Sequence, residues 1–337
     1  MSEVFVRPDV RAFLGYLETM PGPRIHELEP AAARAHLNAT KDVADLPLGT
    51  LAVIRDLAIP SPHGTLAARL FDPRPQREPG PALLFLHGGG FVIGDLDSHA
   101  SACAEIARML DLPVVALDYR LAPEHPWPAA PEDAETAARW LAEAGETLGH
   151  GITGLVLAGD SAGGTLAIVT AMALRDRPAA VPVLAHWPLY PLTDTTRDYP
   201  SFAQFADGYL LTRESIAWFG AAYRAESAHL RASPLLGDMA GMPPALVLTA
   251  GLDPLRDQGR AYAAALAEAG VPVVFREARG NVHGFLNLRR AIPSSQGDLA
   301  GALVALRQIV TEAEADRVMA QAAGLSTSPA AGVGETA

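Results

Sequence analysis

The chain has 337 residues, which is long enough for one large domain with an accessory lid or for two modest domains. Of these residues 49% are hydrophobic and 19% charged, which suits a globular protein with a sizeable buried core. Its net charge of −12 argues against nucleic acid as a partner, because phosphate binding needs a basic face, and against anionic membrane surfaces. Cys103 is the only cysteine, so we expect no internal disulfide and no thiolate metal site. No signal peptide and no run of about 18 apolar residues is recognisable, so we expect a cytoplasmic protein without a membrane span.

Short apolar runs alternate along the chain with amphipathic stretches of helical period. The inner apolar runs are nearly continuous, which is typical of strands that helices cover on both faces. We therefore predict an α/β fold with an eight-stranded, mostly parallel sheet flanked by helices, and functional residues at the carboxyl ends of its strands. The predicted strands are 51–59, 65–71, 81–86, 113–117, 154–158, 181–186, 245–249 and 271–276. The predicted helices are 100–110, 131–144, 162–175, 257–269 and 298–313.

Two segments do not take part in this alternation. Residues 1–48 suggest two or three short helices, and residues 195–232 carry aromatic side chains at partly helical spacing. We expect both to form a helical cap on an α/β domain made of residues 49–194 and 233–318, with residues 319–337 as a flexible tail. The aromatic side chains of the second segment either pack this cap onto the sheet or line an acyl pocket: Tyr199, Phe202, Phe205, Tyr209, Trp218, Phe219 and Tyr223.

The strongest local motif is GDSAG at residues 159–163, which matches G-x-S-x-G. It follows a predicted strand and precedes a predicted helix, as a nucleophile elbow requires. The sharp turn strains the backbone at the serine, and the flanking glycines make room for it. The motif therefore predicts Ser161 as a nucleophile.

A second motif, His87 followed by three glycines, comes directly after a predicted strand upstream of Ser161. Consecutive glycines carry a high cost in backbone entropy, but they let backbone N–H groups approach a ligand closely. Acyl transfer needs such donors for the oxyanion of the tetrahedral intermediate. We predict the N–H groups of Gly88, Gly89 and Ala162 as these donors; the alternative is a flexible glycine turn.

A serine hydroxyl also needs a general base, and a base needs an orienting acid. His283 follows the last predicted strand and fits the chain order serine, acid, histidine. His186 also ends a strand, but it precedes both acid candidates. Asp253 directly follows the penultimate strand, whereas Asp257 sits in the first turn of the next helix, where an acid is favoured for structural reasons alone. We predict Asp253 as the acid, with Asp257 as the alternative.

Other familiar motifs do not support a cofactor or a metal. Residues 149–154 match G-x-G-x-x-G, the dinucleotide fingerprint. This stretch precedes a strand instead of following one, so its glycines cannot cradle a pyrophosphate at a helix N-terminus. No phosphate-binding P-loop, zinc-protease motif or cysteine cluster occurs. We therefore expect no cofactor and no metal.

Taken together, these segments resemble the bacterial hormone-sensitive-lipase-like esterases, a branch of the α/β-hydrolases. The resemblance covers about residues 50–315 and departs at no catalytic position. The matching motifs are HGGGF (87–91), DYRLAPEHPWPAA (118–130), GDSAGG (159–164), DPLRD (253–257) and HGF (283–285).

The resemblance implies a carboxylesterase that acts on short- to medium-chain acyl esters without metal or cofactor. It also implies a small-molecule ester as substrate, a possible homodimer, and a cap built from the two segments outside the alternation. Four residues would be structural rather than catalytic in such an enzyme: His87, Asp118, Arg120 and Glu124.

Two other functions are compatible with the same scaffold. A serine peptidase or amidase would use the same triad on an amide. A non-catalytic receptor of this family would have lost the base, whereas this chain has both His283 and Asp253.

Overall fold

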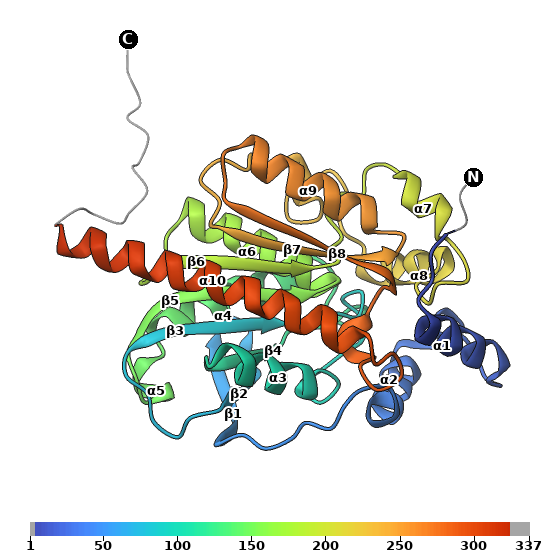
Figure 1. The fold of residues 1–337 in the computed structure, drawn as a ribbon, viewed down its shortest axis with the longest axis horizontal. Helices are drawn as coiled ribbons and strands as arrows, with labels where there is room; N and C mark the ends of the chain where they lie inside the picture. The colour runs from blue at the N-terminus through green and yellow to red at the C-terminus, as the bar shows by residue number, and fades with distance from the viewer. Residues whose placement is uncertain (1–3, 324–337) are drawn as a thin grey trace, which may run out of the picture.

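The computed structural model describes residues 4–323, and its strands form one sheet in the order β1-β2-β4-β3-β5-β6-β7-β8 (Figure 1). β2 runs antiparallel to both of its neighbours, and the other strands pair in parallel. The predicted mostly parallel, eight-stranded sheet is thus confirmed. The strands are β1 (Val53–Ser61), β2 (Gly64–Asp72), β3 (Gly80–Leu86), β4 (Val114–Asp118), β5 (Ile152–Asp160), β6 (Val183–Leu189), β7 (Ala245–Leu252) and β8 (Val273–Val282).

Helices cover both faces of this sheet. One core contains α3 (Ala100–Leu110) and α10 (Ser295–Ala322), and the other contains α4 (Ala129–Glu143), α6 (Ala162–Asp176) and α9 (Arg256–Glu268). Short α5 (Gly145–Leu148) precedes β5.

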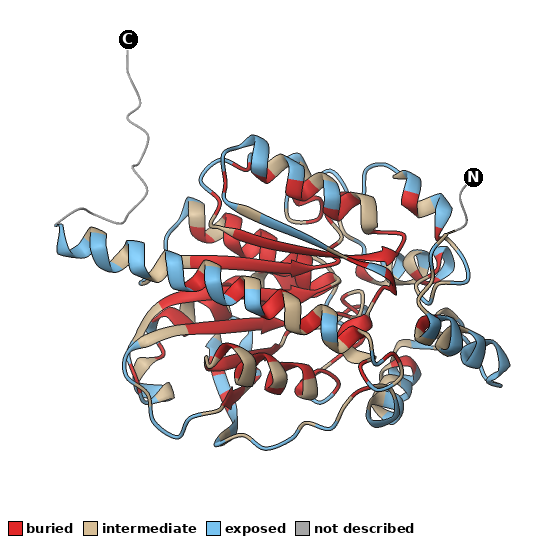
Figure 2. Cartoon of the chain, viewed as in Figure 1, coloured by how far each residue is buried: buried red, intermediate tan, exposed pale blue. Residues whose placement is uncertain are grey.

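The central strands are buried on both faces, as Figure 2 shows. In β3, Leu83 and Phe85 belong to the core under α3 and α10, whereas Leu84 and Leu86 belong to the opposite core. Successive side chains of a strand point to opposite faces, so a strand between two helical layers needs apolar residues at every position. This is why the inner strands read as continuous apolar runs.

The remaining helices come from the two segments that stand outside the strand–helix alternation. α1 (Pro8–Thr19) and α2 (Pro30–Ala44) belong to the first, and α7 (Pro200–Gln204) and α8 (Arg213–Tyr223) to the second. All four lie toward the carboxyl ends of the parallel strands (Figure 1). In addition, 3₁₀ turns occur at Ile25–Glu27, Pro234–Leu236 and Phe285–Asn287.

The structure differs from the predicted elements mainly at the C-terminal end. β8 continues to Val282, and α10 continues to Ala322, so residues 319–322 are helical rather than part of a tail. Arg317 stabilises this last part of α10, because it pairs with Glu314 one turn earlier. The rest of the predicted tail, residues 324–337, lies outside the described residues. No helix between residues 4 and 323 has the length and apolar character needed to cross a membrane.

Candidate active site

Ser161 occupies a strained turn between β5 and α6. Its backbone has φ +54° and ψ −117°, in a region that residues with a side chain rarely adopt. Its N–H donates to the carbonyl oxygen of Leu189 at 2.8 Å, which ties the turn to the end of the neighbouring strand β6. The strain and the tie hold the hydroxyl at the carboxyl edge of the sheet.

The two glycines that flank the serine are required by close packing. A Cβ atom on Gly163 would lie 1.8 Å from the carbonyl oxygen of Leu86, and one on Gly159 would lie 2.3 Å from the carbonyl oxygen of Gly163. The turn therefore rests directly on the backbone at the end of β3. Any side chain at either position would push Ser161 out of place, which explains the G-x-S-x-G spacing.

Three residues that the sequence predicts as a triad meet at this edge. His283 Nε2 lies 2.8 Å from Ser161 Oγ, and His283 Nδ1 lies 2.8 Å from Asp253 Oδ2. Asp253 is fully buried, and its other oxygen accepts the N–H of Leu255 at 2.8 Å. An ionised carboxylate only accepts hydrogen bonds, so Nδ1 of the imidazole carries the proton and Nε2 can accept the serine proton. Tyr190 packs its ring 4.7 Å from that of His283.

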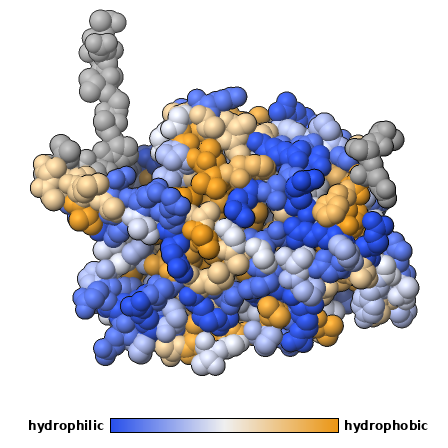
Figure 3. Space-filling view, viewed as in Figure 1, coloured by the Kyte–Doolittle hydropathy of each residue, from blue (hydrophilic) through white to orange (hydrophobic). Residues whose placement is uncertain are grey.

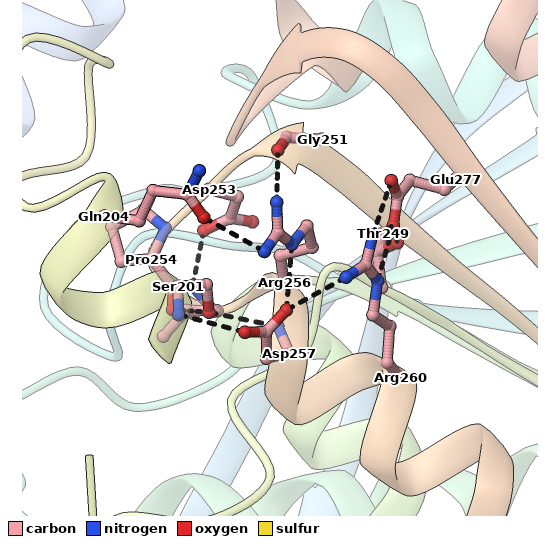
Figure 4. A network of polar contacts seen from close by, with 11 residues as sticks. Ser201, Gln204, Thr249, Gly251, Asp253, Pro254, Arg256, Asp257, Arg260 and Glu277 are labelled. Atoms are coloured by element: carbon pink, nitrogen blue, oxygen red, sulfur yellow. Dashed lines mark hydrogen bonds and ion pairs between the residues drawn. The ribbon is translucent and has the colours of Figure 1, made fainter. Parts of the chain in front are cut away.

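Asp257, the alternative acid, faces a different partner (Figure 4). It accepts the N–H of Ser201 at 2.9 Å, and its own N–H donates to Ser201 Oγ at 3.1 Å. Burial alone would raise the pKa of the Asp257 carboxyl, but the hydrogen bond and charge of Arg256 hold it below its usual value. Ser201 Oγ also donates to the carbonyl oxygen of Pro254 at 2.8 Å. Asp257 thus links the turn after β7 to α7, and its hydrogen-bond and ion-pair partners in the described residues do not include His283.

The glycine loop after β3 corrects one sequence-based prediction. The N–H of Gly88 donates to Asp160 Oδ1 at 2.7 Å, so Gly88 is not free to donate to a substrate. Gly89 and Gly90 have φ of +117° and +59°. Within residues 4–323, the N–H groups of Gly89, Gly90 and Ala162 have no hydrogen-bond partner. The sequence could not show which of the three glycines has a free N–H group, because that depends on the conformation of the loop.

His87 shapes this loop. Its Nδ1 lies 2.8 Å from the carbonyl oxygen of Gly88, which can only accept, so Nδ1 carries the proton. That oxygen belongs to the peptide unit whose N–H is on Gly89, so the contact fixes the direction of the Gly89 N–H. Burial lowers the pKa of His87 to about 4, which keeps the ring neutral near pH 7. The ring of Tyr119 stacks on it at 4.2 Å.

Two aromatic side chains of α8 contact the same loop. A Cβ atom on Gly90 would lie 2.3 Å from the ring of Phe219, so this ring lies directly on the glycine. Phe91 stacks on Tyr223 with 3.9 Å between the ring centroids. Phe205, in contrast, packs in a small core with Val10 and the ends of the last strands. The aromatics of residues 195–232 therefore divide into those near the loop and those that pack helices onto the sheet.

The DYRLAPE segment forms a polar scaffold. Arg120 pairs with the buried carboxylate of Asp133 at 2.8 Å, and Glu124 pairs with Arg34 at 2.7 Å. Burial raises the pKa of Asp118 to about 6. None of these side chains is hydrogen-bonded to the Ser161 or His283 side chain. In the part of the chain that the structure describes, no group of three His, Cys, Asp or Glu side chains could hold a metal ion.

Comparisons with known proteins agree with this geometry. The family model described as alpha/beta hydrolase fold matches residues 83–287. Esterase LipI of Mycobacterium tuberculosis is 42% identical over 262 residues, which are 76% of this chain and 82% of the relative. An ethyl acetate hydrolase of Pseudomonas putida is 38% identical over 319 residues, which are 90% of this chain and 99% of the relative.

Solved structures give the same result. A thermostable esterase from Pseudomonas putida superposes with a TM-score of 0.85 at 29% identity, covering 92% of this chain and 99% of the other. An ester hydrolase from the metagenome of Lake Arreo, complexed with a bipyridine phosphonate derivative, gives a TM-score of 0.83 at 34% identity, with 90% and 99% covered.

Proposed function

This chain belongs to the α/β-hydrolase fold family, in its branch of hormone-sensitive-lipase-like carboxylesterases, and on that premise we propose that Ser161, His283 and Asp253 are its catalytic residues. It is a carboxylic ester hydrolase. The observation that carries the assignment is the continuous chain of two 2.8 Å contacts from Ser161 through His283 to Asp253. Each of the three side chains takes one role in acyl transfer.

In the first half of the reaction, Ser161 Oγ attacks the carbonyl carbon of the ester and its proton passes to His283 Nε2. The carbonyl oxygen becomes an oxyanion in a tetrahedral intermediate. When the intermediate collapses, the C–O bond breaks and His283 returns the proton to the leaving alcohol, which leaves an acyl group on Ser161. Water then enters by the same steps and releases the acid.

The oxyanion donors are the N–H groups of Gly89, Gly90 and Ala162. Ala162 is the first residue of α6, so its N–H has no partner within the helix. The dipole of α6 adds partial positive charge at the same point. Gly90 replaces Gly88 in this set, because the Gly88 N–H is engaged by Asp160.

The substrates are short- to medium-chain acyl esters, bound under a helical cap formed by residues 4–48 and 195–232. The contact of Phe219 with the glycine loop supports this placement of the cap, and the name of the ethyl acetate hydrolase relative supports small acyl groups. An amidase would use the same triad, so turnover of matched butyryl ester and butyryl anilide separates the two activities. Higher turnover of the anilide would reject the esterase assignment.

The experiment that tests the mechanism is the Ser161→Ala variant. We expect it to lose hydrolysis of p-nitrophenyl butyrate while its thermal unfolding stays close to that of the parent. Ser61→Ala, at the end of β1, is the matched control and keeps full activity. A phosphonate ester should add covalently to Ser161, detected by peptide mass spectrometry, and labelling of any other residue would contradict the assignment.

A homodimer through the β8 edge is a second part of the proposal. β8 is the last strand of the sheet, and Val274 and Phe275 on it are 37% and 42% exposed. Figure 3 shows hydrophobic residues on the face in view above α10, where β8 and α9 lie. Arg7 covers the end of this edge, because it donates to the carbonyl oxygens of Arg279 and Gly280. Among the described residues, no further strand pairs with residues 273–278, and such an edge with apolar side chains favours association. Sedimentation should show a dimer in the parent and a monomer in Phe275→Glu; a monomeric parent would reject this part.

We also place the enzyme in the cytoplasm. Its single thiol, Cys103, is buried, and burial raises the pKa of that thiol, so it is an unreactive core residue. Fractionation of the producing cells tests this, and activity in the culture medium would contradict it.

A further inference from the structure

A buried carboxylate lies between the two halves of the active site. Asp160, the residue before Ser161, is only 3% exposed. Its Oδ1 accepts the N–H of Gly88 at 2.7 Å, and a Cβ atom on Gly88 would lie 2.4 Å from its Oδ2. The carboxylate therefore packs directly against the glycine loop while its own backbone continues into the nucleophile turn.

The carboxylate has partners that a buried charge requires. His99 Nε2 lies 3.3 Å from Asp160 Oδ1, and the His99 ring is itself only 4% exposed. Tyr190 donates its hydroxyl to Asp160 Oδ2 at 3.4 Å. On its other side, His99 Nδ1 contacts Ser98 Oγ at 2.9 Å. A carboxylate without such partners would be strongly unfavourable in the interior, so the cluster is built to keep this charge there.

We propose that Asp160, supported by His99, is a positioning residue that fixes the oxyanion loop at the correct distance from Ser161. The inference rests on the proposed function of Ser161 and of the Gly89 and Gly90 N–H groups. Asp160 does not face the substrate; it acts through Gly88, whose neighbour Gly89 carries a free N–H. The β3–β5 ladder ends at the pair Leu86 and Gly159, and beyond it the glycine loop is irregular backbone with no ladder hydrogen bond to the elbow.

The expected size of the effect follows from this geometry. A displacement of about 1 Å between reacting groups can cost about 100-fold in rate, and loss of one oxyanion donor costs about 100- to 1,000-fold in kcat. Such donors act on the transition state, so the loss should appear in kcat and not in KM. A purely structural role for the cluster would lower stability and leave kcat unchanged.

Asp160→Asn is the first test, because it removes the charge and keeps the shape. We expect kcat on p-nitrophenyl butyrate to fall about 10- to 100-fold with KM within about threefold. Affinity for a trifluoromethyl ketone, which forms a tetrahedral adduct with the serine, should fall by the same factor. The matched control is Asp72→Asn: this carboxylate is 5% exposed and pairs with Arg77 at 2.7 Å at the opposite edge of the sheet, so kcat should not change.

His99→Gln gives a second, independent variant in case Asp160→Asn does not fold. It should lower kcat and ketone affinity together, by a smaller factor, and the losses in the double variant should be less than additive. The proposal is overturned if the folded variants keep kcat and ketone affinity within twofold of the parent, whatever their melting temperature. The proposed function fails separately, because only its failure would leave Ser161→Ala active.

Discussion

The two sides of the active site are attached to the flanking helices in different ways. On the oxyanion side, α2 uses one long side chain. Arg34 donates to the carbonyl oxygen of Val92, just after the glycines, and to that of Ala122 in the DYRLAPE segment, both at 2.8 Å. On the acid side, α7 uses Ser201, which is fully buried and exchanges hydrogen bonds with Asp257. The α2 attachment thus uses a long, partly exposed side chain. The α7 attachment uses a short, buried side chain that both donates to and accepts from its partner.

The two attachments differ because the neighbouring strands and helices hold the two sides to different degrees. The acid turn lies between β7 and α9, and it is already fixed by both elements. The glycine loop has several residues with positive φ, and its internal hydrogen bonds are limited to those from the N–H groups of Val92 and Ile93 to the carbonyl oxygen of Gly89. Contacts from outside the loop therefore contribute more to its position. We therefore expect changes at the α2 contact to affect kcat, and changes at the α7 contact to affect mainly stability.

The largest effect should come from the acid itself. Asp253→Asn should lower kcat about 10,000-fold, because the imidazole would be held in the wrong tautomer. Asp257→Asn should keep kcat within about tenfold and lower the free energy of unfolding by about 1–3 kcal/mol. Steady-state kinetics and urea unfolding of both variants decide this. If Asp257→Asn were the more damaging to kcat, the assignment of the acid would be wrong.

Gly90→Ala should be the next most harmful change. The new Cβ would lie 2.3 Å from the Phe219 ring, and the φ of +59° is unfavourable for alanine. We expect kcat to fall about 100-fold, as for loss of one oxyanion donor. Gly149→Ala is the control, because it has φ +83° and no atom within 4 Å of its Cβ position, and it should keep full activity. Adding Phe219→Ala should restore part of the lost rate; no recovery would show that the collision is not the cause.

At the α2 contact, Arg34→Ala should lower kcat about tenfold through a loosened loop, with little change in the melting temperature. Glu124→Gln is the matched control, because it removes the ion pair of Arg34 and keeps its two bonds to carbonyl oxygens. A loss of kcat in both variants would assign the effect to the ion pair. An unchanged kcat in Arg34→Ala would remove the distinction between the two sides.

The pH dependence of stability should also separate the sides. His87 on the oxyanion side has its pKa lowered to about 4, against about 6.5 in the unfolded chain, so the unfolded state binds more protons between these values. Stability should therefore fall as pH drops through this window, by up to about 1.4 kcal/mol per pH unit. On the acid side, the pKa of Asp257 is lowered from 3.8, so its contribution is lost only at lower pH.

Urea unfolding of the parent and of His87→Gln at pH 7 and pH 5 measures this difference. The variant should lose less stability between the two pH values than the parent does. His186→Gln should be measured as well, because burial also lowers the pKa of His186 to about 4, at a position away from the loop. This variant separates the contribution of His186 from that of His87. If the free energy of unfolding fell equally in the parent and in His87→Gln between pH 7 and pH 5, the assignment of this proton to His87 would be wrong.

Much of this fold could be predicted because its signals are local. The inner strands are apolar at every position, and the elbow is recognisable from its G-x-S-x-G spacing between a strand and a helix. The close contact with Leu86 that requires Gly163 comes from a distant part of the chain. The sequence predicts the extension of α10 to Ala322 less clearly. Val318 and Met319 are exposed in this part of the helix, so the sequence has no repeating apolar face there. Pairing of Glu314 with Arg317 was the feature that could have indicated a longer helix.

The roles of the three loop glycines could not be predicted from local sequence. What selects Gly88 for the Asp160 contact is a hydrogen bond between residues 72 positions apart. The same holds for the acid side, where Ser201 meets Asp257 across 56 positions. In both cases the deciding partner lies on another element, so only the packed structure shows which residue is engaged.

The smallest effect should come from Ser201→Ala at the α7 contact. The substitution removes the hydroxyl that accepts the Asp257 N–H and donates to the Pro254 carbonyl oxygen. The backbone bond from Ser201 N–H to the carboxylate remains, so we expect a loss of about 1–2 kcal/mol in the free energy of unfolding and kcat within about threefold. A loss of kcat as large as that of Arg34→Ala would mean that the acid turn depends on its flanking helix as much as the glycine loop does. The two attachments would then differ in form and not in function.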